Sequence, residues 1–263
     1  MHDPYEGVTS NGTIQTGARR DRVAGMFDPV LAAAILESCI ADCDSSLYLY
    51  GSVATGMAQP GLSDVDLLTV GLPSAEAADV TRALSARFSD LCRGVEVAVA
   101  QESDFRGESD ESYGSRVFLR HYCVHLAGPD MHSSLPDFPA DVRAARGFNG
   151  DIAQHAQRWK TELADGSDAA RLSRRLARKS LLAVAGLVSV HDETWTTDRA
   201  TAAARWAEIE PILADDLQTL LLWSGECATH DRGSVAAALD GVISRIILDF
   251  ETLIGLWQVE PGC

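Results

Sequence analysis

The pattern of apolar and polar positions changes near residue 140. Before it, short apolar runs bounded by glycine or proline predict strands, because a buried strand presents a brief run of apolar side chains. These runs cover residues 47–50, 63–68 and 94–100, and residues 116–128 form a further apolar element. Apolar stripes and helix-start signals predict helices over 28–43 and 74–92. The first part is therefore predicted to be a small mixed sheet with flanking helices.

After residue 140 the pattern is helical. Four segments, separated by short polar turns, cover residues 141–164, 168–190, 198–223 and 232–257. Their lengths and short connections predict an up-and-down bundle. Residues 131–141 contain two prolines and two serines, which is typical of a domain junction. We therefore predict an α+β fold with a flexible tail at 1–25, a sheet domain at 26–140 and an all-helical domain at 141–263.

Charge narrows the classes of partner. The 263 residues carry a formal net charge of −16, and residues 26–140 contain 17 acidic and six basic residues. Proteins bind nucleic acid through a basic surface, so this charge argues against nucleic acid as the main partner. The acidic first domain either steers a cationic substrate toward the protein or serves only solubility.

The sequence gives no sign of export or of a membrane. No apolar run approaches the roughly 20 residues that cross a bilayer, and residues 1–25 lack the apolar core of a signal peptide. We therefore expect a cytoplasmic protein without a membrane partner, and its oligomeric state is not predicted. The six cysteines form no CxxC pair, which argues against a zinc site or a disulfide framework. His121, Cys123 and His125 alternate, either as ordinary positions on a buried element or as one face of a metal site.

Residues 47–68 carry the candidate chemistry. The first predicted strand ends at Gly51-Ser52, and a second strand with a D-x-D pattern follows. Side chains two apart on a strand point to the same face, so Asp64 and Asp66 are expected side by side. Adjacent carboxylates repel and need a shared proton or a cation, of which a hard divalent cation is the simplest. The alternative is a surface strand with two solvated aspartates.

A basic cluster lies in the second domain. It consists of Arg171, Arg174, Arg175, Arg178 and Lys179, of which the four arginines share one face of a predicted helix. Guanidinium groups on one stripe repel one another unless anions lie opposite. A nucleoside triphosphate is one candidate anion, because arginine forks match phosphate oxygens. The alternative is a solvated face paired with the carboxylates of this acidic protein.

The Gly-Ser turn, the spacer and the D-x-D strand resemble the signature of the DNA polymerase beta-type nucleotidyltransferase superfamily. The run GVEVAVA offers the third carboxylate, Glu96, that the superfamily fold adds on a later strand. LYLYGSVATGMAQPGLSDVDLLTVG, GVEVAVA and the Gly-Pro segment VHLAGPDMHSSLPDFP together look like aminoglycoside O-adenylyltransferases of the streptomycin/spectinomycin type. Leu176-Ala177-Arg178 resembles an arginine-bearing helix of that family, and Thr197-Asp198-Arg199 resembles its lysine-containing turn. The similarity spans roughly residues 45–215.

The resemblance implies a reaction and its residues. Asp64, Asp66 and Glu96 become Mg²⁺ ligands, and Glu96 also takes the proton from the acceptor hydroxyl. The implied nucleotide contacts are Gly51, Ser52, Ser63, Arg178 and Arg199. The implied reaction moves AMP from ATP to a hydroxyl of a small, cationic acceptor such as an aminoglycoside-like compound, and releases pyrophosphate.

The chain departs from the family in two places. Arg199 stands where the family usually has lysine, which keeps the charge but changes the geometry. The stretch after the Glu96 strand is shorter than in the family and has no tryptophan. Residues 101–115, QESDFRGESDESYGS, are expected to form a polar, acidic loop, either a lid over the site or a disordered surface loop.

Three other functions remain open. The chain is alternatively a nucleotidyltransferase that modifies a protein partner, as in toxin–antitoxin systems, an enzyme that modifies RNA ends, or a non-catalytic nucleotide-sensing regulator. Val53-Ala54-Thr55 lacks the arginine that small antitoxins of the superfamily usually carry after Gly-Ser. The negative charge counts against RNA, and the three carboxylates count against a regulator without catalysis.

Overall fold

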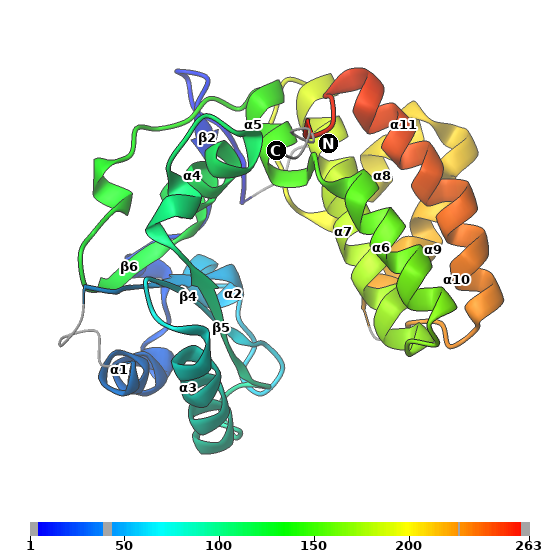
Figure 1. The fold of residues 1–263 in the computed structure, drawn as a ribbon. Coiled ribbons are helices and arrows are strands. Elements are labelled where there is room, and N and C mark those ends of the chain that lie inside the picture. Colours follow the sequence, from blue (N-terminus) through cyan, green and yellow to red (C-terminus); the bar gives the residue numbers. More distant parts are fainter. Residues whose placement is uncertain (1–4, 39–43, 226, 259–263) are drawn as a thin grey trace, which may run out of the picture. The chain divides into compact units, whose positions relative to one another are not determined.

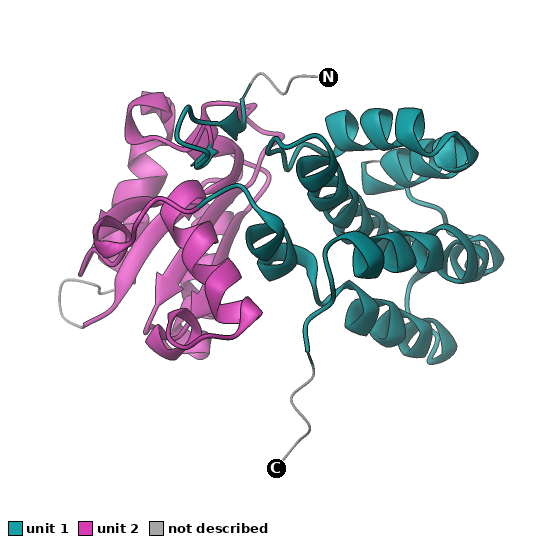
Figure 2. Ribbon diagram, turned by 90° about the horizontal axis from the view of Figure 1, so that it is seen from above, with its two compact units in different colours: residues 1–15, 139–263 teal, residues 16–138 magenta. Residues whose placement is uncertain are grey.

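The computed structural model describes residues 5–38, 44–225 and 227–258. The chain divides into two compact units (Figure 2). We call residues 16–138 the sheet unit, and residues 1–15 together with 139–263 the helical unit. The chain therefore begins in the helical unit, passes through the whole sheet unit and returns to the helical unit. Among the helices that the structure describes, none is long and apolar enough to cross a membrane.

A four-stranded mixed sheet lies at the centre of the sheet unit (Figure 1). Its strands are β3 (Ser46–Tyr50), β4 (Val65–Val70), β5 (Val95–Ala100) and β6 (Val124–Ala127), in the order β5-β4-β3-β6. β4 is parallel to β5, whereas β3 is antiparallel to both β4 and β6. The predicted mixed sheet is confirmed.

Helices cover both faces of this sheet. They are α1 (Asp28–Glu37), α2 (Gly51–Thr55), α3 (Ser74–Arg87) and α4 (Asp110–Tyr122). One face carries a large apolar core that α1 and α3 share with Leu49, Leu67 and Val95. On the other face, Tyr48 and Leu68 pack in a smaller apolar cluster that includes residues of α4. Because strand side chains alternate, this second face also carries Asp66 of β4 and Glu96 of β5. Residues 39–43 of the predicted first helix lie outside the described residues.

The stretch 101–115, expected as a polar loop, is largely helical. It contains a 3₁₀ turn, η4 (Glu102–Phe105), and the first turns of α4. Gln101 caps η4 in a capping box with Asp104, and the Ser109 side chain accepts a hydrogen bond from the Ser112 N–H at 3.1 Å. Three of the polar residues that suggested a loop, Gln101, Asp104 and Ser109, are therefore helix caps, which satisfy N–H groups at helix starts.

The helical unit is built around α7. Its helices are α5 (Val142–Asn149), α6 (Ile152–Ala164), α7 (Ala169–His191), α8 (Arg199–Ile209), α9 (Ala214–Ser224), α10 (Arg232–Ala238) and α11 (Ser244–Leu253). α7 contacts α5, α6, α8, α9 and α11, and 14 of its 23 residues are buried. The fold class is confirmed, but three predicted helices are divided. The breaks fall near Gly150, at a 3₁₀ turn η6 (Pro211–Leu213) and at a π-helical segment, η7 (Leu239–Ile243).

The amino-terminal segment differs from the predicted flexible tail. Strands β1 (Gly7–Val8) and β2 (Ile14–Gln15) pair as a small antiparallel sheet within the helical unit. Thr13 forms a bridge with Pro139, and the Glu6 carboxylate accepts a hydrogen bond from the Thr197 hydroxyl at 2.9 Å. These partners are distant in sequence, so the residue pattern of the segment itself does not reveal them. Residues 16–25 belong to the sheet unit.

Candidate active site

The register of the sheet places the predicted carboxylates together. Asp66 on β4 pairs with Tyr50 on β3 and with Glu96 on β5. Directly paired residues project from the same face of a sheet, and Asp64 lies two residues before Asp66, just ahead of β4. We call Asp64, Asp66 and Glu96 the carboxylate cluster. Asp64 and Asp66 are partly buried, and Glu96 is exposed. The structure thus brings together the three acidic residues that the sequence pattern selected.

Positive charge near the cluster only partly offsets the burial and mutual repulsion of its carboxylates. Burial raises the pKa of Asp66 to about 6, and the charges of Glu96 and Asp64 act in the same direction, while Arg93 opposes them. Burial also raises the pKa of Tyr50, to which the charges of Asp66 and Glu96 contribute. A carboxylate in this setting gains from a bound proton or a nearby cation. Either a proton on Asp66 or a cation beside it would relieve this unfavourable charge.

Arg93 is a site residue to which the sequence pattern did not point. Its Nε donates a hydrogen bond to Asp64 Oδ1 at 3.1 Å, and its Nη2 pairs with Asp64 Oδ2. The Asp64 side chain is 16% exposed and that of Arg93 is 60% exposed. The hydrogen bond to Asp64 raises the pKa of Arg93. The sequence does place Arg93 three residues before Glu96. Its contact with Asp64, however, depends on the pairing of β4 with β5, which the sequence does not specify.

Gly51 is required next to Asp66. Its φ of +72° is a left-handed backbone conformation, which glycine adopts without steric cost. A Cβ atom added at Gly51 would collide with the Asp66 carboxylate. Gly51 begins α2, and the partly buried Ser52 follows it. The absence of a side chain at Gly51 therefore leaves room for the Asp66 carboxylate.

Ser63 has a structural role in the loop before β4. Its Oγ accepts a hydrogen bond from the Gln59 N–H at 2.9 Å, and its own N–H donates to the Gln59 carbonyl at 2.9 Å. The Ser63 carbonyl accepts from the Arg93 N–H at 3.0 Å. Ser63 thus joins the loop that carries Asp64 to the turn that carries Arg93. Its predicted nucleotide contact remains a prediction.

In the helical unit, the structure brings Arg178 of α7 close to Arg199 of α8. Burial lowers the pKa of Arg199, and the charge of Arg178 lowers it further, while Asp198 acts in the opposite direction. Arg178 Nε donates to the Ser224 carbonyl at 2.8 Å. Arg178 and Arg199 therefore bring two positive charges close together, and both side chains are partly buried.

Three of the other four members of the basic cluster have side-chain partners within the protein. Arg175 forms an ion pair with Glu162 at 2.7 Å, and Arg174 donates to the Gly225 carbonyl at 3.0 Å. Lys179 pairs with Asp151 at 2.8 Å. The alternative interpretation, in which the basic residues pair with the protein's own groups, therefore holds for these three residues.

The carboxylate cluster fits a divalent cation by its donor chemistry. Three carboxylates offer the hard oxygen ligands that Mg²⁺ prefers, and burial together with the neighbouring carboxylates disfavours the charged form of Asp66. Within residues 5–38, 44–225 and 227–258, no three Asp, Glu, His or Cys side chains are already arranged around one metal position. Binding would therefore require some movement of these side chains.

His121, Cys123 and His125 do not share a site. His121 Nε2 accepts a hydrogen bond from the Phe138 N–H at 2.9 Å, and burial lowers the pKa of His121 to about 4. Cys123 lies in the smaller apolar cluster, and His125 Nε2 is 2.9 Å from the Gly128 carbonyl oxygen. The strand alternation does not apply to them, because α4 ends at Tyr122 and β6 begins only at Val124.

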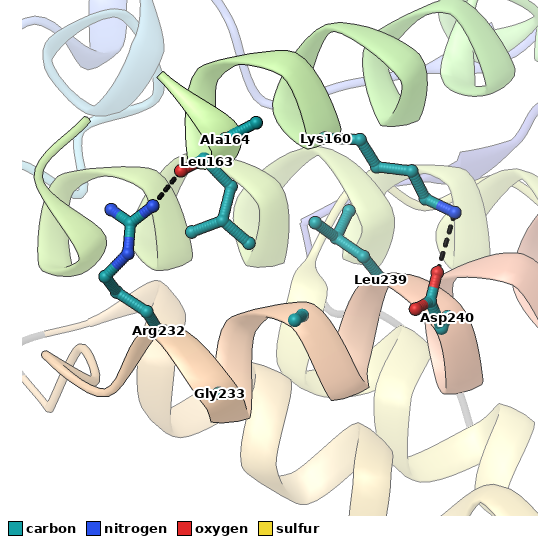
Figure 3. A pocket seen from close by; sticks show the side chains of 8 residues that line it. Lys160, Leu163, Ala164, Arg232, Gly233, Leu239 and Asp240 are labelled. Atoms are coloured by element: carbon teal, nitrogen blue, oxygen red, sulfur yellow. Dashed lines mark hydrogen bonds and ion pairs between the residues drawn. The ribbon is translucent and has the colours of Figure 1, made fainter. Parts of the chain in front are cut away.

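A separate hollow of about 410 Å³ lies in the helical unit beside α6 and α10 (Figure 3). Lys160 at one end pairs with Asp240 at 2.7 Å, and Arg232 at the other end donates to the Leu163 carbonyl. None of the predicted site residues lines it. The candidate site is therefore assigned to the carboxylate cluster and not to this hollow.

Comparison with known proteins agrees with this assignment. Residues 34–119 match the family model described as nucleotidyltransferase domain, a span that contains the carboxylate cluster. A solved structure of spectinomycin adenyltransferase AAD(9) from Enterococcus faecialis, with ATP and spectinomycin, is similar with a TM-score of 0.51 and 12% identity. The match covers 86% of this chain and 98% of that chain. No curated protein matches the chain. The predicted resemblance to nucleotidyltransferases is confirmed, and the structural match shows a shared fold.

Proposed function

We propose that the chain is an Mg²⁺-dependent nucleotidyltransferase that moves AMP from ATP to a hydroxyl of a small, cationic acceptor in the cytoplasm. The observation that carries this proposal is the β4–β5 register, which sets Asp66 beside Glu96 with Asp64 close by. The nucleotidyltransferase match covers these residues. A spectinomycin adenyltransferase with ATP has a similar fold, which supports ATP as the donor and a small molecule as the acceptor.

Asp64 and Asp66 would hold the cation with their carboxylate oxygens, and the Glu96 carboxylate would lie beside it. A bound Mg²⁺ would neutralise charge on the triphosphate and on the leaving pyrophosphate. Arg178 and Arg199 would bind phosphate oxygens, for which their close, partly buried guanidinium groups are suited.

Glu96 is proposed as the general base because its side chain is exposed on the cluster face and accessible to an acceptor. It would take the proton of the acceptor hydroxyl. The acceptor oxygen would then bond to the α-phosphorus, and the bond from that phosphorus to the bridging oxygen of the β-phosphate would break. Pyrophosphate leaves, and AMP remains on the acceptor.

A cationic acceptor is favoured by charge. Residues 26–140 carry 17 acidic and six basic side chains, and such a surface attracts cations over several ångströms in low salt. The apparent affinity for the true acceptor should therefore fall as the salt concentration rises. A flat salt response would count against an aminoglycoside-like substrate.

The experiment uses ATP labelled in the α-phosphate together with Mg²⁺. The protein is incubated separately with a panel of aminoglycoside-like compounds, with a cell lysate and with total RNA. Label in a small molecule supports the proposal, and mass spectrometry then identifies the modified hydroxyl. Label in protein or RNA would show that the acceptor is a macromolecule and not a small molecule. Binding of Mg-ATP without transfer to any pool would indicate a nucleotide sensor. Asp66→Asn serves as the inactive control.

A further inference from the structure

Arg93 reaches Asp64 because two chain segments are tied together by their backbones. The Arg93 N–H donates to the Ser63 carbonyl at 3.0 Å, and the Val65 N–H donates to the Gly94 carbonyl at 2.9 Å. These bonds set the turn before β5 beside the start of β4. The guanidinium group then contacts both carboxylate oxygens of Asp64.

This contact engages the same atoms that a cation would need. A carboxylate that receives two hydrogen bonds from one guanidinium has its oxygens directed at that group. Asp64 is one of the two D-x-D carboxylates that would hold the cation in the proposed function, and both of its oxygens already contact Arg93. A divalent cation that binds Asp64 must therefore share or displace the Arg93 contact.

We propose that Arg93 is an internal counter-ion of the cation site, which holds Asp64 before the cation binds and then moves to the phosphates of the nucleotide. The inference rests on the proposed function for its second step. The Arg93 side chain is 60% exposed, so it can change partner without unpacking the core. Once it is displaced from Asp64, the Arg93 guanidinium stays near the cluster and pairs with the negatively charged phosphates of ATP.

Another arginine of the sheet unit, Arg82, provides a comparison. Arg82 pairs with Asp79 at 2.8 Å, and both side chains are more than 70% exposed on α3. An ion pair this exposed contributes little to the stability of the protein. Arg93 differs because its partner is 16% exposed and belongs to the carboxylate cluster. Arg82→Gln is therefore a matched control that removes an ion-paired guanidinium away from the cluster.

The test measures Mg²⁺ binding by calorimetry on the full chain without nucleotide. Arg93→Gln should bind Mg²⁺ roughly two- to fivefold more tightly than the wild type, because the competing cation is gone. Arg82→Gln should leave the affinity unchanged. Arg93→Lys keeps the charge and should stay near the wild-type value, which provides a second variant if Arg93→Gln folds poorly. Unchanged or weaker Mg²⁺ binding by a folded Arg93→Gln protein would overturn the proposal.

A second measurement addresses the move to the phosphates. At saturating Mg²⁺, Arg93→Gln should bind ATP more weakly than the wild type, while Arg82→Gln should not. ATP binding that is unaffected by Arg93→Gln would overturn this step. Because neither readout requires transfer of AMP, a protein that fails the labelling experiment can still show the predicted Mg²⁺ effect. Failure of this inference and failure of the proposed function are therefore distinguishable.

Discussion

Replacing Asp66 by asparagine should stabilise the cation-free protein above pH 6 and have little effect near pH 4. Burial and two neighbouring carboxylates raise the pKa of Asp66 from 3.8 to about 6. The folded protein therefore binds this proton more tightly than the unfolded chain does. As the pH rises from about 4 through about 6, the folded state must accept a charge that it disfavours, and the free energy of unfolding falls. Asparagine has no such charge to accept.

The size of this effect follows from the pKa. One pKa unit corresponds to about 1.4 kcal/mol, so the difference between 3.8 and about 6 would amount to about 3 kcal/mol. Asp66 is only partly buried and solvent screens its charge, so we expect about 1–2 kcal/mol. For a chain of this size such a gain raises the melting temperature by a few degrees, on the order of 3–6 °C.

The assay is thermal unfolding with a chelator at pH 4.5, 6 and 8. Asp79→Asn is the matched control, because it removes the same charge from a side chain that is 72% exposed on α3. Adding Mg²⁺ at pH 8 should raise the melting temperature of the wild type and have less effect on Asp66→Asn. Equal destabilisation of Asp66→Asn at every pH would refute the reasoning, because it would mean that the Asp66 carboxylate makes a net favourable contact.

Three further predictions concern neighbouring features. Gly51→Ala should lower the melting temperature more than Gly61→Ala, since both glycines have positive φ but only a Cβ at Gly51 meets the cluster. Glu6→Gln should reduce the free energy of unfolding of the helical unit by roughly 1–2 kcal/mol in a urea titration, because charged hydrogen bonds to Thr197 become neutral. Glu96→Gln should bind Mg-ATP nearly normally in calorimetry while pyrophosphate release falls at least about 10²-fold, as expected on loss of a general base.

Only the aspartate pair of the cluster was predictable from the local sequence. Asp64 and Asp66 are two residues apart at the start of β4, and the two-residue period of a strand predicts that they lie on one face, although β4 itself begins at Val65. The β-branched run around Glu96 predicts another strand, but not which strand it pairs with. The Asp66–Glu96 register that completes the cluster became visible only in the sheet.

Other features depend on partners that no local pattern specifies. Arg93 and Asp64 are 29 residues apart, and their contact exists only because β4 and β5 are neighbours. The partner of Glu6 is Thr197, 191 residues away, so the order of the amino-terminal segment could not be inferred from its polar composition. The same limit applies to the arginine face, where the spacing predicts a stripe but α6 and α9 supply the partners of Arg175 and Arg178.

The charge of this protein also shows why acid content alone does not locate a site. Asp79 and Asp66 are the same residue type in the same acidic unit, but Asp79 faces water and pairs with an exposed arginine. Asp66 is held between Tyr50 and Glu96 on a central strand and partly removed from water. The difference in environment, not in composition, gives Asp66 its raised pKa. In our proposal, the exchange of partners by Arg93 acts on the same environment, because it changes how much positive charge the cluster holds before nucleotide arrives.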